Sequence, residues 1–212
     1  MSDKIIDVIL NRRGIKPEDR SEFLNPDYKK QNDPFLLPDM DAAVARLVEA
    51  KQTQENITIY GDYDVDGVTA SALLLDSLGK MGFKNVDYFL PDRFIDGYGI
   101  SERAVKIMKG RGTSLILTVD CGSLNHTEIG LANSLGMEVI VTDHHNIAEV
   151  QPNAVAVVNP RRSENKYPGG SNFAGVGVAF KLAQALSSKL SGLENGHEKW
   201  MLDLVALGTV CD

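Results

Sequence analysis

The chain has 212 residues, of which 43% are hydrophobic and 24% charged, and this suits a soluble globular protein with one large core. Its net charge of −7 argues against a DNA-binding protein with a basic surface, although the acids of a metal site add to this excess and bound divalent ions offset it. There is no apolar run of membrane-spanning length, the first residues lack the features of a secretory signal, and only two distant cysteines occur, so we expect a cytoplasmic protein without a disulfide framework.

The first fifty residues are expected to be helical. Apolar side chains recur at helical spacing in Lys16–Leu24 and in Asp41–Gln52. The stretch between them, Asp33–Met40, contains two prolines that should prevent a helix. We therefore expect residues 1–55 to form an N-terminal helical segment that packs on a domain formed by residues 56–212.

From residue 56 onward, strand-like runs alternate with helical ones. The expected strands are Asn56–Gly67, Asn85–Asp92, Ser114–Gly122, Glu138–His145 and Asn153–Pro160. The expected helices are Gly67–Phe83, Ile100–Gly112, His126–Met137, Gly177–Leu190 and one from about Glu198. This rhythm predicts an α/β fold, in which a doubly wound, mostly parallel sheet carries helices on both faces.

Acidic residues and histidines lie at the ends of three of these strands. Because the carboxyl ends of parallel strands share one edge of a sheet, we expect the side chains to converge there. Carboxylates crowded together resist ionisation, and bound cations remove that conflict. The sequence therefore predicts a metal-dependent centre for phosphoryl hydrolysis. The residues concerned are Asp62, Asp64, Asp66, Asp120, Asp143, His144 and His145.

The segment DYDVDG places three aspartates two residues apart. Alternate residues of an extended segment point to one side, so Asp62, Asp64 and Asp66 can face the same pocket. A calcium-binding EF-hand loop also opens with this spacing, but it requires a glutamate where this chain has Leu73 and a helix where this chain has a strand. A solvated acidic turn without a metal is the other alternative.

The triplet Asp143–His144–His145 favours a transition metal such as Mn²⁺, because neutral imidazole suits such ions better than it suits magnesium or calcium. Adjacent histidines at a strand end point in different directions, so one can bind a metal while the other contacts a phosphate. Asp143 could orient a histidine by a hydrogen bond. Asp120 taken alone could equally cap a helix, and it is the combination of motifs that favours ligation.

Several motifs together resemble the DHH phosphoesterase superfamily, and within it the RecJ-type single-strand-specific exonucleases. The motifs are GDYDVDGVTA, RFIDGYGIS, VDCG, TDHH, VNPRR, AGVGVAFKL and LDLVALGTVCD, and the resemblance extends from Ile57 to Asp212. It implies a DHH phosphoesterase domain with two Mn²⁺ or Mg²⁺ ions. It also implies that the substrate is single-stranded DNA, degraded from its 5′ end during DNA repair and recombination.

The resemblance assigns roles to individual residues. The implied metal ligands are Asp62, Asp64, Asp66, Asp120, His144 and Asp212. In the family, the aspartate that matches Asp120 bridges both ions, and the histidine that matches His145 faces the scissile phosphate. Some relatives use an upstream histidine in place of the ligand at Asp62, and Cys211 replaces the common alanine before the last ligand. Asp120, Asp143 and His145 are therefore the expected catalytic residues.

Further residues are expected to contact the substrate: Arg93, Tyr98, Arg161, Gly175 and Gly177. Arginines can bind the nucleic-acid backbone, as Arg162 could also do, and a tyrosine can stack on a base. Glycines before a helix can present backbone amides to a phosphate. Each of these residues has a plain structural alternative, namely a solvated charge, a buried ring or tight helix packing.

The chain ends at the last residue of these motifs, whereas RecJ-type proteins continue with a DHHA1 domain and often an OB-fold. It therefore resembles a catalytic domain of a longer protein, whose other parts would hold most of the DNA and contact single-strand-binding protein or a helicase. Two alternatives are open. One is a phosphodiesterase for short oligoribonucleotides or cyclic dinucleotides, or a polyphosphate or pyrophosphate hydrolase; the other is a nucleic-acid-binding relative without activity.

Overall fold

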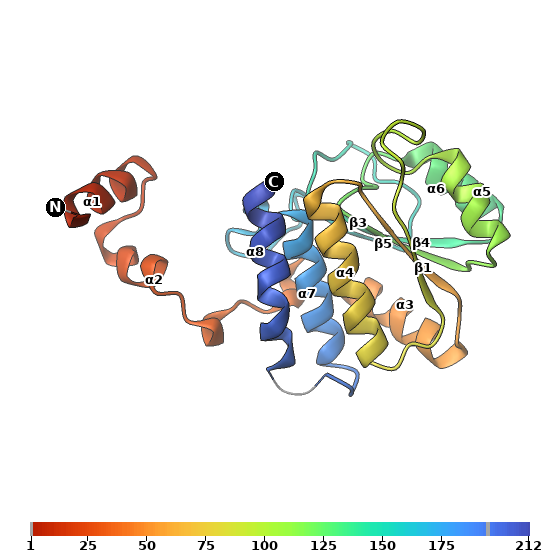
Figure 1. The fold of residues 1–212 in the computed structure, drawn as a ribbon, viewed down its shortest axis with the longest axis horizontal. Coiled ribbons are helices and arrows are strands. Elements are labelled where there is room, and N and C mark those ends of the chain that lie inside the picture. Colours follow the sequence, from red (N-terminus) through yellow and green to blue (C-terminus); the bar gives the residue numbers. More distant parts are fainter. Residues whose placement is uncertain (1, 194–195) are drawn as a thin grey trace. The chain divides into compact units, whose positions relative to one another are not determined.

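The computed structural model describes residues 2–193 and 196–212 and divides the chain into two compact units, residues 1–33 and 34–212 (Figure 1). The smaller unit contains α1 (Ser2–Arg12), α2 (Arg20–Leu24) and the 3₁₀ turns Pro17–Asp19 and Tyr28–Lys30. Within this unit the Arg20 guanidinium connects the two helices, because it lies 3.0 Å from a carboxylate oxygen of Asp7 and 2.5 Å from the side-chain oxygen of Asn11.

The larger unit is built on a parallel sheet. Among the described residues its strands are β1 (Ile57–Gly61), β2 (Val86–Phe89), β3 (Leu115–Val119), β4 (Glu138–Thr142) and β5 (Ala156–Val158), in the order β2-β1-β3-β4-β5. The register places Gly61 beside Val119, and Val119 beside Thr142. The residues that follow β1, β3 and β4 therefore leave the sheet at the same level.

Helices cover both faces of this sheet, which confirms the predicted α/β fold. The helices are α3 (Met40–Thr53), α4 (Val65–Lys80), α5 (Glu102–Gly110), α6 (His126–Ser134), α7 (Gly175–Ser187) and α8 (Leu202–Cys211). On one face α4, α7 and α8 pack together; α5 and α6 pack on the other (Figure 1). Strand residues alternate between two cores, so that Tyr60 and Ile116 join α5 and α6 while their neighbours Ile59 and Leu117 are buried on the opposite side.

The strand order locates the crevice in which such sheets bind ligands. From β1 the chain first adds β2 on one side and then adds β3, β4 and β5 on the other. Ligands bind outside the carboxyl ends of the strands where the winding reverses, which here is between β1 and β3. The first acidic motif leaves β1 and Asp120 leaves β3, so both lie at this crevice.

The structure refines several expected boundaries. The linker of residues 33–40 contains a 3₁₀ turn, Pro34–Leu36, and α3 belongs to the larger unit, where it packs on α7 and β5. The last strand is short and ends before Asn159, and the final helix is preceded by a 3₁₀ turn, His197–Met201. Among the described residues, no helix combines the length and apolar character needed to cross a membrane.

Candidate metal centre

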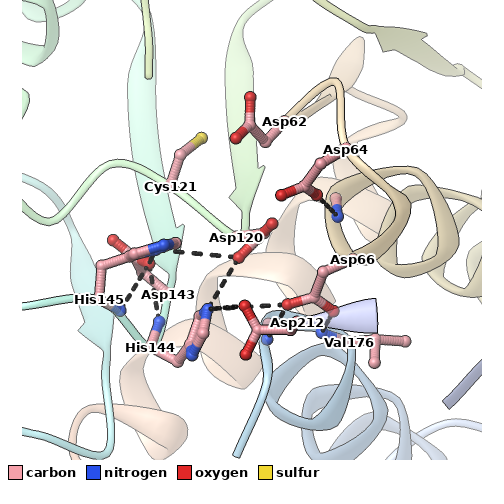
Figure 2. A network of polar contacts seen from close by, with 12 residues as sticks. Asp62, Asp64, Asp66, Asp120, Cys121, Asp143, His144, His145, Val176 and Asp212 are labelled. Carbon is pink, nitrogen blue, oxygen red and sulfur yellow. Dashed lines mark hydrogen bonds and ion pairs between the residues drawn. The ribbon is translucent and has the colours of Figure 1, made fainter. Parts of the chain in front are cut away.

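The first acidic motif joins β1 to α4. Asp64 caps the helix, because its carboxylate accepts a hydrogen bond of 2.9 Å from the Gly67 amide. Asp62 is buried at the strand end and accepts a hydrogen bond from the next amide, that of Tyr63. Gly67 is required here, since a Cβ at this position would lie 2.5 Å from the Asp62 nitrogen. The turn is therefore folded tightly enough to point several carboxylates at one crevice (Figure 2).

Asp66 connects the first turn of α4 to the start of α7. Its buried carboxylate accepts hydrogen bonds from the amides of Gly175 at 2.5 Å and Val176 at 2.8 Å, which are among the free donors of the α7 N-terminus. Burial raises the pKa of Asp66, and these two hydrogen bonds only partly offset the increase. Helix α8 approaches closely at Gly208, where a Cβ would lie 2.9 Å from an Asp66 oxygen, and this approach brings Asp212 to the centre.

Asp120 is the most constrained acid of the centre. It adopts the left-handed conformation, with φ +62°, and only 1% of its surface is exposed. Neither carboxylate oxygen has a hydrogen-bond partner among the described residues. Burial raises the pKa of Asp120 to about 10, and the charges of Asp66 and Asp64 add to the increase. Gly175 makes room for this carboxylate, since a Cβ there would lie 2.6 Å from it.

His144 lies at the middle of the acidic cluster. Its Nε2 atom is 3.1 Å from an oxygen of Asp120 and 3.7 Å from oxygens of both Asp66 and Asp212 (Figure 2). The contact with Asp120 is short, yet its direction does not make a hydrogen bond, so that Nε2 is buried without a partner among the described residues. A buried nitrogen and two buried carboxylate oxygens thus point toward the same space, unpaired.

Asp143 and His145 form a separate, hydrogen-bonded pair. One oxygen of Asp143 accepts from the amides of His144 and His145 and lies 2.9 Å from Nδ1 of His145; the other accepts from the Ser123 amide. Burial alone would raise the pKa of Asp143, but these hydrogen bonds lower it overall. The hydrogen bond to Asp143 in turn raises the pKa of His145 against the opposing effect of burial.

The segment after β5 holds both histidines by their backbone, which the motif alone did not reveal. Asn159 is buried and donates to the His145 carbonyl at 3.0 Å and to the Ser123 hydroxyl at 2.8 Å. The Nε of Arg161 donates to the His144 carbonyl at 2.6 Å. A polar residue at the end of a buried strand was the available signal for Asn159, whereas nothing in the sequence singled out Ser123.

The geometry of the donor atoms fits divalent cations. Three groups of residues each place their ligand atoms within 4.8 Å of one another: Asp62, Asp64 and Asp120; Asp66, His144 and Asp212; and Asp120, His144 and His145. All six expected ligands occur in the first two groups, and the unpaired atoms of Asp120 and His144 lie among them. Carboxylate oxygen with one or two imidazole nitrogens suits Mn²⁺, and cations in this space would pair the orphaned buried atoms.

Two of the residues expected to contact substrate lie beside the centre. Tyr98 packs the edge of its ring against His145, with ring centroids 5.4 Å apart. The Arg93 guanidinium lies 5.4 Å from the ring centroid of Tyr63, the residue after Asp62. Tyr98 thus contacts a residue of the centre, whereas Arg93 contacts the residue that follows Asp62, and Tyr63 is a neighbour that the sequence did not indicate.

For the two glycines and for Arg162 the structure corrects the expectation. The amide of Gly175 is bound by Asp66, and that of Gly177 donates to a carbonyl of the preceding turn, so neither is free for a phosphate. Arg162 is nearly buried and pairs with Asp39 at the start of α3, which makes it a structural brace. The contacts of these residues are therefore helix packing and internal pairing.

Comparison with known proteins identifies relatives of this chain. The family "DHH family, N-terminal domain" matches residues 56–209. The single-stranded-DNA-specific exonuclease RecJ of Bacillus subtilis (strain 168) is 42% identical over 205 residues, which cover 96% of this chain and 25% of that protein. A crystal structure of exonuclease RecJ bound to manganese is 36% identical, with a TM-score of 0.71 over 82% of this chain and 43% of the other. RecJ from Thermus thermophilus in complex with Mn²⁺ is 31% identical, with a TM-score of 0.68 over 95% of this chain and 27% of the other.

These similarities confirm the resemblance that the motifs predicted. The chain spans between a quarter and about a third of the length of the curated relatives it matches most strongly. The matched residues contain every strand of the sheet and the acids that follow them.

Proposed function

The chain belongs to the DHH family, and from this premise we propose that its strand-end cluster is the two-metal centre of a phosphodiesterase. Its substrate in this proposal is single-stranded DNA, degraded from the 5′ end during repair and recombination in the cytoplasm. The observation that carries the proposal is the set of buried, unpaired atoms of Asp120 and His144 among four other acids. The exonuclease activity named for its relatives and the manganese in their structures support it.

In this proposal Asp120, which groups with Asp62 and Asp64 and also lies 3.1 Å from His144, would serve both cation positions. Asp62 and Asp64 would complete one position, and Asp66, His144 and Asp212 would complete the other. Mn²⁺ or Mg²⁺ fits both sets, and the histidine favours Mn²⁺. When bound, such ions lower the pKa of water and stabilise the charge that develops during in-line displacement at phosphorus.

The role of His145 follows from its partner. The lowered pKa of Asp143 keeps that carboxylate ionised, so we assign the Nδ1 proton of His145 to the hydrogen bond between them. This leaves Nε2 to face the substrate, and the raised pKa of His145 favours the charged ring. A charged imidazole held in place can donate to a phosphate oxygen and stabilise its developing charge.

The wider context is also part of the proposal. The chain carries 22 lysines and arginines against 29 acids, so most of the grip on long DNA would come from other parts of the protein, of the DHHA1 and OB-fold type. Those parts would also contact single-strand-binding protein or a helicase. Residues 56–212 would form the phosphoesterase domain, preceded by residues 1–55 as an N-terminal segment. Arg93, Tyr98 and Arg161 would line the path of the substrate.

A substrate panel tests this function. With Mn²⁺, the protein should release nucleotides from the 5′ end of a 5′-phosphorylated single strand and leave a duplex intact. Asp120→Asn should abolish the release, while Asp76→Asn, which alters an exposed acid paired with Lys80 on α4, should not. Hydrolysis of pApA, a cyclic dinucleotide or pyrophosphate with no degradation of DNA would overturn the proposed substrate. DNA binding without any hydrolysis would instead favour the inactive relative.

A further inference from the structure

The loop of residues 92–99 follows β2 and exposes an unusual amount of apolar surface beside the metal centre. Phe94 is 96% exposed, Ile95 64% and Tyr98 54%. A single exposed apolar side chain is ordinary on a protein surface and requires no explanation. Three within five residues, next to a catalytic crevice, are more typical of a surface that binds something.

The loop is held in shape from within. The Asp96 side chain is buried; its carboxylate accepts from the Ser101 hydroxyl at 2.8 Å, from Arg103 at 2.9 Å and from the Asp92 amide at 3.0 Å. The Asp92 carboxylate accepts in turn from the Phe94 amide at 2.8 Å. Both acids of the loop are therefore used internally, and the backbone that carries Phe94 is fixed.

Contacts to His145 and to the turn after β1 anchor the same loop. Tyr98 packs on His145, and Arg93 lies over the ring of Tyr63, which follows the first metal-binding aspartate. The Tyr60 hydroxyl on β1 donates to the carbonyl of Gly99 at 2.8 Å and fixes the end of the loop. The loop is therefore attached at several points to residues that belong to the centre or adjoin it.

We propose that this loop is a stacking platform, in which the Phe94 ring stacks on the face of an unpaired nucleobase close to the scissile phosphate. The inference rests on the proposed function and adds a residue that selects the substrate. An aromatic ring binds any base through its π-face, and Arg93, the residue before Phe94, brings positive charge for the backbone. Four peptide units connect Phe94 to Tyr98, so their Cα atoms lie within about 14 Å of each other. Because Tyr98 contacts His145, a base that stacks on Phe94 would be near the bond that is cleaved. A base inside a duplex does not offer its face, so the contact favours single strands.

Substitution of Phe94 tests the platform, and its exposure makes misfolding a minor concern. Phe94→Ala should lower kcat/KM on a short 5′-phosphorylated single strand by about 5- to 150-fold, the effect of losing one base stack. Phe94→Leu, which is apolar without a π-face, should resemble Phe94→Ala, and Phe94→Trp should restore activity. Hydrolysis of methyl p-nitrophenyl phosphate, which has no base, should be unchanged in all three. Trp200→Ala removes another exposed aromatic, from the turn before α8, and serves as the control.

Abasic sites locate the base. If an abasic residue is moved along the strand from the 5′ end, one position should remove the difference between wild type and Phe94→Ala, because the stacked base is then absent. If the wild type degrades the strand and Phe94→Ala matches it at every position, the platform is overturned. If the wild type degrades no strand, the proposed function fails first. Affinity by fluorescence anisotropy in EDTA then decides the platform, and equal dissociation constants for wild type and Phe94→Ala reject it.

Discussion

Asp120 and Asp143 occupy equivalent places on neighbouring parallel strands, yet their surroundings are opposite. Each directly follows its strand, β3 or β4, and each is 1% exposed. Asp143 accepts backbone hydrogen bonds from three amides and contacts a histidine ring, and its pKa is lowered. Asp120 accepts no hydrogen bond from the described residues, although histidine nitrogens lie 3.1 and 3.8 Å from it (Figure 2), and its pKa is raised to about 10.

The difference shows that the protein itself supplies hydrogen-bond donors to Asp143, whereas Asp120 has none among the described residues and is available to a ligand. A buried carboxylate without donors is costly, so a fold that keeps one gains from a cation at that point. A buried carboxylate with a full set of donors is stable as an anion and can hold a histidine in one orientation. We therefore expect substitutions at the two positions to fail in different ways.

The largest effect is expected from Asp120→Asn. Loss of a group that only orients a ligand weakens metal binding by about 10- to 100-fold, so loss of a carboxylate that we propose to serve two cation positions should exceed that range. Titration calorimetry with Mn²⁺ should show fewer bound ions as well as weaker binding. Asp143→Asn should keep the stoichiometry of the wild type, and an equal loss of ions in both variants would remove the distinction between the two acids.

The two histidines extend the comparison, since His144 lies among the acids around Asp120 and His145 is hydrogen-bonded to Asp143. His144→Ala should weaken Mn²⁺ binding, because Nε2 lies among three acids. His145→Ala should leave the affinity for Mn²⁺ nearly unchanged and lower kcat on the order of 10²–10³-fold, as for the loss of one donor to the transition state. Metal titration and single-turnover cleavage measure the two quantities separately. Identical behaviour of the two variants would contradict this division.

A smaller effect is expected at Asp143, with a characteristic pH dependence. Asp143→Asn removes the main cause that raises the pKa of His145. The charged ring is present below its pKa and lost above it, so the alkaline limb of the rate profile should move to lower pH in the variant. The rate near neutral pH should fall about 10- to 100-fold. If the rate falls at every pH and the alkaline limb keeps its position, Asp143 has only a structural role.

Much of the fold and the convergence of the acids could be predicted, because both depend on local patterns. The apolar runs defined four strands to within three residues, whereas β1 ends six residues before the expected Gly67. The parallel register then placed the residues after Gly61, Val119 and Thr142 at one level. The acids of the motifs were identified on the same basis. The sequence motifs did not show that these acids have separate chemical roles.

What the sequence did not reveal depends on contacts between distant segments. The left-handed backbone of Asp120 has no periodic signal, and neither does the use of the Gly175 amide by Asp66, 109 residues away. Asn159 reaches Ser123 across 36 residues to hold the histidine segment. Such contacts form only after the helices have packed on the sheet, and they decide which acid is left unpaired.

The last prediction concerns stability without metal. Because the pKa of Asp120 is raised in the folded protein, the folded state keeps a proton that the unfolded chain releases above about pH 4. The free energy of unfolding should therefore fall as pH rises toward about 10, by at most about 1.4 kcal/mol per pH unit for this one group. Asp120→Asn carries no such proton, so its advantage over the wild type should grow with pH. Urea unfolding in EDTA from about pH 6 to about pH 9 measures both slopes, with Asp76→Asn as the surface control. Added Mn²⁺ should remove the advantage, because the ion binds the ionised acid; a constant difference at every pH would mean that Asp120 is already ionised in the metal-free protein.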